Sequence, residues 1–306
     1  MIHNSDDQLK QKITKLKKQR KAIILVHNYQ PSEVQDIADY SGDSLELSRI
    51  ASTTEAGVVV FCGVHFMAET AAILCPDKTV LLPDINAGCP MADMITAGAL
   101  KTLKQEHPQA VVIAYVNTSA EVKAEVDVCC TSTNAVKIVE ALKNKKEIIF
   151  VPDKYLGSYV AAQTKKTMIC WSGYCPTHLM ILPENIMQQK KNYPHAEVLI
   201  HPECAQPVIA LADFVLSTGG MCKHVKVSSA AEFIIATEIG LLHRLRKDNP
   251  EKKFYPASDL AICPNMKLIT LEKILWALEE MKYIIDVPAD IRRRAKKAVD
   301  SMLKII

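Results

Sequence analysis

Short apolar segments alternate along the chain with polar turns and with amphipathic, helix-like stretches. Apolar runs at 22–26, 58–61 and 79–83 have the length and the apolar content of buried strands, whereas 7–19 repeats its apolar residues at helical spacing. Each run leads into a few polar residues before the next element. Strands that alternate with helices in this way are typical of a parallel sheet with right-handed crossovers, so the pattern predicts an α/β protein.

The same order of elements recurs twice more. A second and a third set of strand-like segments follow, at 110–114, 147–151, 167–171, 197–200, 214–216, 233–236 and 253–255. We therefore predict three pseudo-equivalent three-layer α/β/α domains, called units below, with parallel four-stranded sheets, in residues 1–108, 109–194 and 195–306. The first unit includes an N-terminal helix, and the third includes two C-terminal helices, which begin near Leu271 and at Pro288.

Polar residues follow the first two strands of each unit. The first strands lead to His27, Asn117 and His201, and the second strands lead to Ser44, Ser132 and Thr218. Parallel sheets bind ligands beyond the carboxyl ends of their strands. Three such edges that face one another would enclose a central cavity, which we expect to be one shared binding site.

Composition narrows the classes of protein that fit this pattern. The 306 residues are 49% apolar and 23% charged, which is enough apolar content for a sizeable core. A net charge of +3 is too small to indicate a nucleic-acid partner. The polar N-terminal segment lacks the apolar core of a secretory signal, and no apolar run has the length of a membrane span, so we expect a cytoplasmic protein.

Three of the ten cysteines form a pattern of their own. Cys89, Cys175 and Cys263 are almost evenly spaced, each precedes a proline, and each is expected near the end of the fourth strand of its unit. The spacing differs from the local pairs of zinc ribbons and ferredoxins, so these thiols would have to converge through the fold. Three thiolates suit zinc or an iron-sulfur cluster, and the spacing leaves both open. The other cysteines are interpreted as buried apolar residues, with the role of Cys204 left open.

A three-cysteine [4Fe-4S] cluster would leave one iron without a protein ligand, and such an iron can polarise a substrate oxygen as a Lewis acid. Candidate acid–base groups lie at the same predicted edge: His27 and His201 at strand ends, with Tyr29 and Glu203 two residues beyond them. Histidine can bind anions when charged and can move protons near neutral pH. The alternative is that these four residues only orient their loops.

Several ordered motifs resemble those of the quinolinate synthase family, the A protein of NAD biosynthesis. They run from the first predicted strand to the last Cys-Pro step: His27-Asn28-Tyr29-Gln30, Gly42-Asp43-Ser44, Gly63-Val64-His65-Phe66-Met67-Ala68-Glu69, Tyr115-Val116-Asn117, Thr131-Ser132-Thr133-Asn134, Pro152-Asp153, His201-Pro202-Glu203 and Cys263-Pro264-Asn265-Met266. The resemblance implies three α/β/α domains around a [4Fe-4S] cluster in a central cavity, in agreement with the repeat.

The resemblance also implies roles for individual residues. The cluster ligands would be Cys89, Cys175 and Cys263, and His178 matches a position near the cavity. The substrate-binding residues would be His27, Ser44, Tyr115, Asn117, Ser132, His201, Glu203 and Thr218. Tyr29, His27, His201 and Glu203 would be the catalytic residues, with Tyr29 and Glu203 implicated in proton transfer.

In the family this site is a transferase that condenses iminoaspartate with dihydroxyacetone phosphate to quinolinate, with loss of phosphate and two waters. An enzyme that produces iminoaspartate is then a candidate partner, and neither nucleic acid nor membrane is expected. Two alternatives remain at this stage: a radical iron-sulfur enzyme of the diphthamide-synthesis type, and a non-catalytic iron-sulfur redox sensor.

Overall fold

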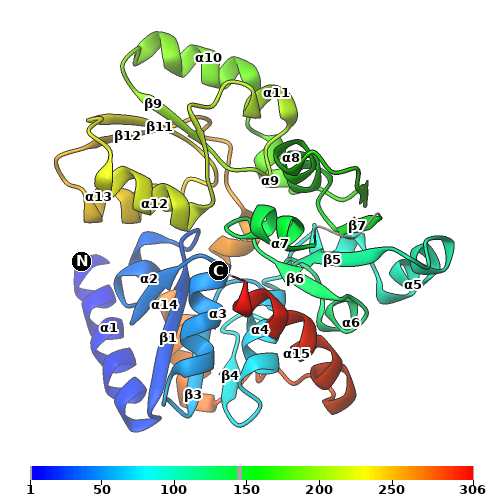
Figure 1. Ribbon diagram of the computed structural model, residues 1–306. Coiled ribbons are helices and arrows are strands. Elements are labelled where there is room, and N and C mark those ends of the chain that lie inside the picture. The colour runs from blue at the N-terminus through cyan, green and yellow to red at the C-terminus, as the bar shows by residue number, and fades with distance from the viewer. Residues whose placement is uncertain (1, 143–146, 306) are drawn as a thin grey trace.

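The computed structural model describes residues 2–142 and 147–305, and it contains three separate parallel sheets (Figure 1). The first sheet comprises β1 (Ala22–His27), β2 (Tyr40–Gly42), β3 (Val58–Cys62) and β4 (Thr79–Leu81). The second comprises β5 (Val111–Tyr115), β6 (Val128–Cys130), β7 (Ile148–Val151) and β8 (Ile169–Cys170). The third comprises β9 (Glu197–Ile200), β10 (Phe214–Val215), β11 (Glu232–Ala236) and β12 (Lys253–Pro256).

All three sheets have the same strand order. The first is ordered β2-β1-β3-β4, the second β6-β5-β7-β8 and the third β10-β9-β11-β12, and every pair within them is parallel. The prediction of three parallel four-stranded sheets is therefore confirmed. Because the carboxyl ends of parallel strands lie at one edge, each unit presents its polar strand ends on one side.

Helices connect the strands and cover the sheets. Those before and around the first sheet are α1 (Ile2–Gln19), α2 (Ser32–Asp36), α3 (Ser44–Thr53) and α4 (His65–Leu74). Next along the chain come η1 (Ala92–Met94) and α5 (Ala97–Glu106), and the second unit then contains α6 (Ala120–Lys123), α7 (Ala135–Ala141), α8 (Lys154–Thr164) and α9 (Pro176–Leu179). The remaining helices are α10 (Pro183–Asn192), α11 (Gln206–Ile209), α12 (Thr218–Val227), α13 (Leu241–Asp248), η2 (Pro264–Lys267), α14 (Leu271–Glu280) and α15 (Ala289–Lys304).

The third sheet shows why its strands read as continuous apolar runs. Val198 and Ile200 pack into one buried cluster, with residues of α10 and α11, whereas Leu199 packs into another on the opposite face, with residues of α12 and α13. Helices on both faces of a parallel sheet bury the side chains that its central strands direct to either face. The predicted three-layer arrangement is thus present in this unit.

A repeated hydrogen bond fixes how the units correspond. In each unit a backbone N–H of the first strand donates to an aspartate just before the second strand, at 2.8 Å: Ile24 to Asp39, Val112 to Asp127 and Val198 to Asp213. Aligned on this bond, Tyr115 corresponds to His27 and His201. The expectation that Asn117 holds that position was wrong, because β5 ends at Tyr115 and Asn117 lies two residues beyond the strand.

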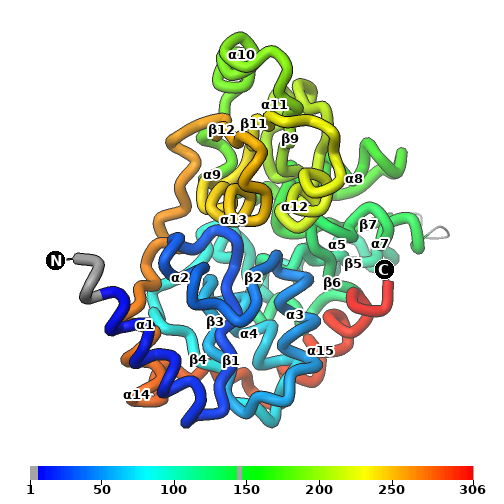
Figure 2. Tube along the Cα trace, turned by 90° about the vertical axis from the view of Figure 1, so that its left-hand side faces the viewer, coloured from blue at the N-terminus to red at the C-terminus, as the bar shows by residue number. Residues whose placement is uncertain are grey.

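The two C-terminal helices pack away from the third sheet. Helix α14 lies against α1 and β3, and α15 lies against α4, α6 and β6 (Figures 1 and 2). Their apolar residues join the core cluster that spans the first and second sheets. The end of the chain therefore fastens the first two units to each other, and the division at 108 and 194 stays a prediction.

Candidate active site

One cavity of about 70 Å³ lies where the three units meet, and side chains from all three units line it. Every site residue predicted from the sequence is among them: His27, Tyr29, Ser44, Cys89, Tyr115, Asn117, Ser132, Cys175, His201, Glu203, Thr218 and Cys263. These residues are scattered over most of the chain, and the fold brings them all to one place.

The twelve residues occupy four equivalent positions in the three units. The first strand ends at or just before His27, Tyr115 and His201, and two residues later come Tyr29, Asn117 and Glu203. The second strand leads to Ser44, Ser132 and Thr218, and the loop after the fourth strand carries Cys89, Cys175 and Cys263. The cavity is thus built from one recurring edge, used three times with different side chains.

The cysteines lie in loops after the fourth strands rather than at the strand ends that the sequence suggested. Strand β4 ends at Leu81, β8 at Cys170 and β12 at Pro256. Each loop is attached to its sheet by the same backbone bond, whose acceptor lies two residues before the cysteine: His65 N–H to Ala87, Lys154 N–H to Gly173 and Ile239 N–H to Ala261, at 2.7, 2.9 and 3.0 Å. This bond places each thiol at the edge that carries the other site residues.

Gly173 shows how tightly one of these loops fits. A Cβ atom at this position would lie 2.4 Å from the carbonyl oxygen of Pro152, so a larger residue would push the loop away from the strand. Pro152 begins the Pro152-Asp153 motif, and Asp153 forms a bridge with Gly173. The motif is therefore explained by its contact with the loop that carries Cys175.

The three thiols are close enough for their charges to interact, but they do not form a site for one ion. Burial raises the pKa of Cys89 to about 12, and the charge of Cys263 adds to this; burial also raises the pKa values of Cys175 and Cys263. Backbone N–H groups of the helical turns that follow partly oppose this effect. Within the described residues, the group of donor atoms near enough to hold a single ion contains only Cys175 of the three.

The remaining cysteines lie outside the cavity. Cys204 is fully buried in the core of the third unit, and its thiol contacts the carbonyl oxygen of Ala236. In this structure Cys204 is therefore a core-packing residue. Cys75 is likewise buried and donates to Ala51 O.

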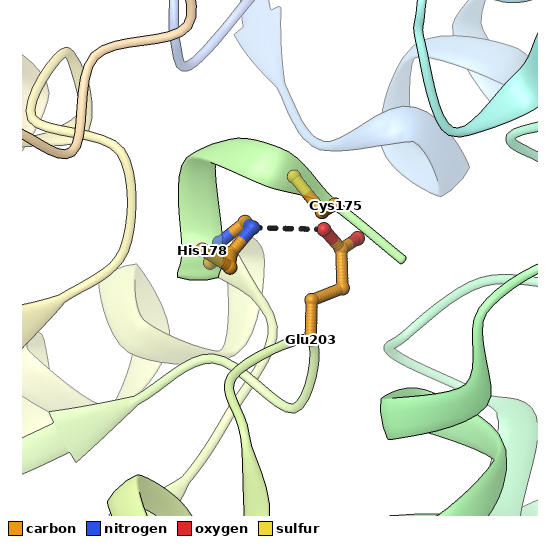
Figure 3. Close-up of side chains that lie close together, drawn as sticks. All are labelled: Cys175, His178 and Glu203. Carbon is orange, nitrogen blue, oxygen red and sulfur yellow. Dashed lines mark ion pairs between the residues drawn. The ribbon is translucent and has the colours of Figure 1, made fainter. Parts of the chain in front are cut away.

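A chain of polar contacts runs along one wall of the cavity. Glu203 Oε1 accepts a hydrogen bond of 2.5 Å from Tyr115, and Glu203 Oε2 lies 2.9 Å from His178 Nδ1 (Figure 3). The second contact has the distance but not the angle of a hydrogen bond. His178 Nε2 is 2.9 Å from Thr237 Oγ1, which in turn is 2.6 Å from the Tyr29 hydroxyl. Glu203 and Tyr29 are thus linked through two intervening side chains.

Burial and charge separate the protonation states along this wall. Burial alone would raise the pKa of Glu203, but His178, His201 and the bond from Tyr115 outweigh it and hold that pKa well below its usual range. Burial, reinforced by the Glu203 charge, raises the pKa values of Tyr29 and Tyr115 far above 10. Near neutral pH, Glu203 is therefore an ionised acceptor beside protonated tyrosines.

The strand-end histidines are neutral near pH 7. Burial lowers the pKa values of His27 and His201 to about 3, although Glu203 opposes this for both. His201 also stacks on His178, with ring centroids 4.7 Å apart. Among the lining residues that the structure describes there is no lysine or arginine. Anions in this cavity would therefore meet neutral donors rather than a basic patch.

Side chains of all three units also meet beside the hydroxyl residues. Thr133 Oγ1 lies 2.9 Å from Asp43 Oδ2 and 2.8 Å from Ser217 Oγ. These three residues neighbour Ser132, Ser44 and Thr218 in the sequence. Asp43 and Ser217 are also the N-caps of α3 and α12, with side chains that accept backbone N–H groups. The junction holds the three hydroxyl-bearing turns together.

Two residues of the site, Glu238 and Thr237, were not predicted from the sequence. Glu238 is buried on the cavity wall, where Oε1 accepts the Cys263 N–H at 3.1 Å and pairs with Lys267 at 2.8 Å. Thr237 joins His178 to Tyr29. Both residues directly follow β11, so their place after a third strand was the available signal.

Comparison with known proteins agrees with this geometry. The family model described as quinolinate synthetase A protein matches residues 11–304. Quinolinate synthase of Dehalococcoides mccartyi strain BAV1 is 56% identical over 295 residues, which cover 96% of this chain and 97% of the relative. Quinolinate synthases of Thermodesulfovibrio yellowstonii and Methanosarcina barkeri are 57% and 53% identical, each over 97% of this chain and 98% of the relative.

The family model and these relatives cover the same three units that build the cavity, from within α1 to within α15. The structure adds that no helix among the described residues is long and apolar enough to cross a membrane. The chain belongs to the quinolinate synthase family.

Proposed function

We propose that this chain, a quinolinate synthase of NAD biosynthesis by its family, condenses iminoaspartate with dihydroxyacetone phosphate in the cavity, with loss of phosphate and two waters. The observation that carries the proposal is the composition of that one cavity. It combines one cysteine from each unit, three hydroxyl-bearing turns and an ionised glutamate beside two tyrosines. Each of these groups matches a requirement of the reaction.

Cys89, Cys175 and Cys263 would hold the iron-sulfur cluster of the family. Their thiols come from three loops anchored in the same way, and the three sulfurs are not among the described donor groups whose atoms all lie within 4.8 Å of one another. Such a cluster supplies an iron without a protein ligand, which can polarise a substrate oxygen as a Lewis acid. The donor set therefore fits a cluster better than the zinc alternative that the sequence left open.

The hydroxyl-bearing turns would bind the anionic groups of the substrates. Ser44 and Thr218 begin α3 and α12, where backbone N–H groups and the helix dipole favour negative charge. Ser132 adds a third hydroxyl at the equivalent place in the second unit. Asn117 Oδ1 is buried without a partner in the described residues, so it is available to accept a hydrogen bond from a substrate. These donors and acceptors would orient phosphate and carboxylates without a full positive charge.

Glu203 would act as the base of the proton transfers. Its ionised carboxylate is held by Tyr115 and faces the cavity, so it can accept a proton from a substrate carbon or nitrogen. Tyr29 stays protonated and can donate to a departing hydroxyl, and Thr237 and His178 connect it back to Glu203. His27 and His201 would act as neutral hydrogen-bond donors.

Iminoaspartate is unstable in water, so we infer that an enzyme which produces it works close to this chain, in the cytoplasm. A closed cavity that excludes water would also protect the imine once it is bound.

The first prediction concerns the reaction itself. Anaerobically purified protein should form quinolinate when iminoaspartate and dihydroxyacetone phosphate are supplied together, and neither substrate alone should suffice. Chromatographic detection of quinolinate tests this. A cluster-loaded protein without any turnover would instead favour a redox sensor or a radical enzyme of the diphthamide-synthesis type.

The second prediction concerns the metal centre. Iron and sulfide analysis of anaerobic protein should give about four irons per chain. Cys89→Ser, Cys175→Ser and Cys263→Ser should each lose the cluster absorbance, because each removes one of three converging thiols. Cys75→Ser is the matched control, since this buried thiol lies outside the cavity. A full cluster in any of the first three variants would contradict the assignment.

The third prediction concerns Tyr29. Tyr29→Phe removes the hydroxyl that contacts Thr237, and kcat should fall by about 10² to 10⁴ while the cluster content is unchanged. Steady-state kinetics and iron analysis on the same sample separate the two effects. Tyr159→Phe is the control, because Tyr159 packs against the core and does not line the cavity. Equal kcat values for the two variants would remove Tyr29 from the mechanism.

The fourth prediction concerns pH. A histidine whose pKa falls from 6.5 in the unfolded chain to about 3 in the fold binds fewer protons when folded, so its contribution to stability is complete above pH 6.5 and declines below it. As the pH falls from 6.5 to about 3, each such histidine should lower the unfolding free energy by about 1.4 kcal/mol for every pH unit of acidification.

Urea unfolding of the cluster-free chain at pH 6.5, 5.5 and 4.5 measures this slope. His27→Gln should reduce the loss of stability on acidification, whereas His195→Gln, at an exposed position, should leave it as in the wild type. Identical slopes for His27→Gln and wild type would show that His27 is not held neutral.

A further inference from the structure

Cys175, His178 and Glu203 bring three metal-binding atoms together on one wall of the cavity (Figure 3). The cysteine sulfur, a ring nitrogen and a carboxylate oxygen all lie within 4.8 Å of one another. We propose that these three side chains bind a single Zn²⁺ ion when the chain lacks its iron-sulfur cluster. The proposed cluster uses only one of them, so this is a second, overlapping metal site.

The orientation of His178 supports the site. Its Nε2 atom is 2.9 Å from Thr237 Oγ1, which fixes the ring and leaves Nδ1 directed at Glu203. Nδ1 is buried and makes no hydrogen bond with the described residues, although Glu203 Oε2 is only 2.9 Å away. A ligating histidine whose second nitrogen is hydrogen-bonded is the usual arrangement at zinc sites. An ion bound to both Nδ1 and Oε2 would lie to one side of the line that joins these two atoms. The contact between His178 and Glu203 allows this, because it lacks the angle of a hydrogen bond.

The spacing of the donors requires little movement. Cys175 is the N-cap of α9 and His178 lies three residues later, so the two side chains project from the same side of one short helical turn. In a tetrahedral zinc site, bonds of about 2.0 to 2.3 Å place neighbouring donor atoms about 3.5 Å apart. Nδ1 and Oε2 are 2.9 Å apart, and the three donor atoms all lie within 4.8 Å of one another, so small adjustments of the side chains would complete the site.

Charge balance also favours a divalent ion. A thiolate from Cys175 and the carboxylate of Glu203 carry two negative charges, which Zn²⁺ neutralises, and His178 contributes a neutral nitrogen. A buried site with zero net charge avoids the large cost of an unpaired charge in a cavity wall. Mixed sulfur, nitrogen and oxygen donors are the ligands that zinc accepts, and three protein ligands leave its fourth position open to the cavity.

The two metal sites exclude each other if the proposed cluster assignment holds, because both need Cys175. Zinc bound to the cluster-free chain would then block cluster assembly until it is removed. The zinc site itself does not depend on the proposed reaction, since its residues and their contacts are those of the chain alone.

Zinc titration of the full-length, cluster-free chain tests the proposal. Competition with a chromogenic chelator should show one Zn²⁺ per chain, and zinc should raise the thermal unfolding temperature. Cys175→Ser and His178→Ala should weaken binding by at least about 100-fold, and Glu203→Gln by at least about 10-fold. Cys89→Ser and Cys263→Ser are the matched controls and should bind zinc as the wild type does, because they remove thiols of the same cavity outside the trio.

Three results would overturn the proposal. They are no zinc binding by the wild type, retained binding in both His178→Ala and Glu203→Gln, and loss of binding in Cys89→Ser and Cys263→Ser as well as in Cys175→Ser. The last result would indicate a three-thiolate site.

Cobalt substitution gives an independent readout on any folded variant. The sulfur-to-cobalt absorption should have the intensity of one thiolate. The thermal unfolding of each variant without metal shows whether it is folded. Because the titration contains no substrate, its outcome is separate from whether the chain makes quinolinate.

Discussion

Three parallel sheets meet at their carboxyl edges, and the site depends on how the cysteine loops are attached there. In every unit one backbone N–H beyond the third strand holds the carbonyl two residues before the cysteine. A hydrogen bond between backbone groups does not depend on the side chains of the two residues. The same attachment is therefore present in all three units, although the residues that form it differ. The thiols are consequently positioned at the same edge that presents the polar strand ends.

The threefold repeat is strict in some positions and broken in others, and the difference follows function. All three units supply a cysteine at one position and a hydroxyl at another, which suits groups that must surround a shared centre or bind similar anions. The position two residues after His27, Tyr115 and His201 differs completely, with Tyr29, Asn117 and Glu203. A symmetric set of three glutamates would place three negative charges in one cavity. With a carboxylate in only one unit, this position contributes a single negative charge to the cavity.

Much of this could be predicted from the sequence, because strand ends and Cys-Pro steps recur at nearly constant spacing and parallel topology brings them to one edge. The alignment of Asn117 failed because spacing alone does not show where a strand ends, whereas the aspartate bonds of the structure do. The packing of α14 and α15 against the first two units could not be predicted either, because their place in the chain suggests that they pack against the third unit. The contact of His178 with Glu203 joins two units, and no periodicity encodes such a pair.

The electrostatics of the cavity set a condition on any anionic ligand. Its described lining offers the neutral His27 and His201, an amide, hydroxyls and carboxyl groups that include the ionised Glu203, and it offers no lysine or arginine. Lys267, the cation that approaches this wall, is paired with Glu238. Hydrogen bonds would orient anionic groups here without neutralising them, and buried charge without compensation is costly. A metal centre held by the three thiols would offer the substrate an open coordination position that the protein side chains do not provide. Ligand binding and metal loading would then be coupled in both directions, so that each stabilises the other to the same extent.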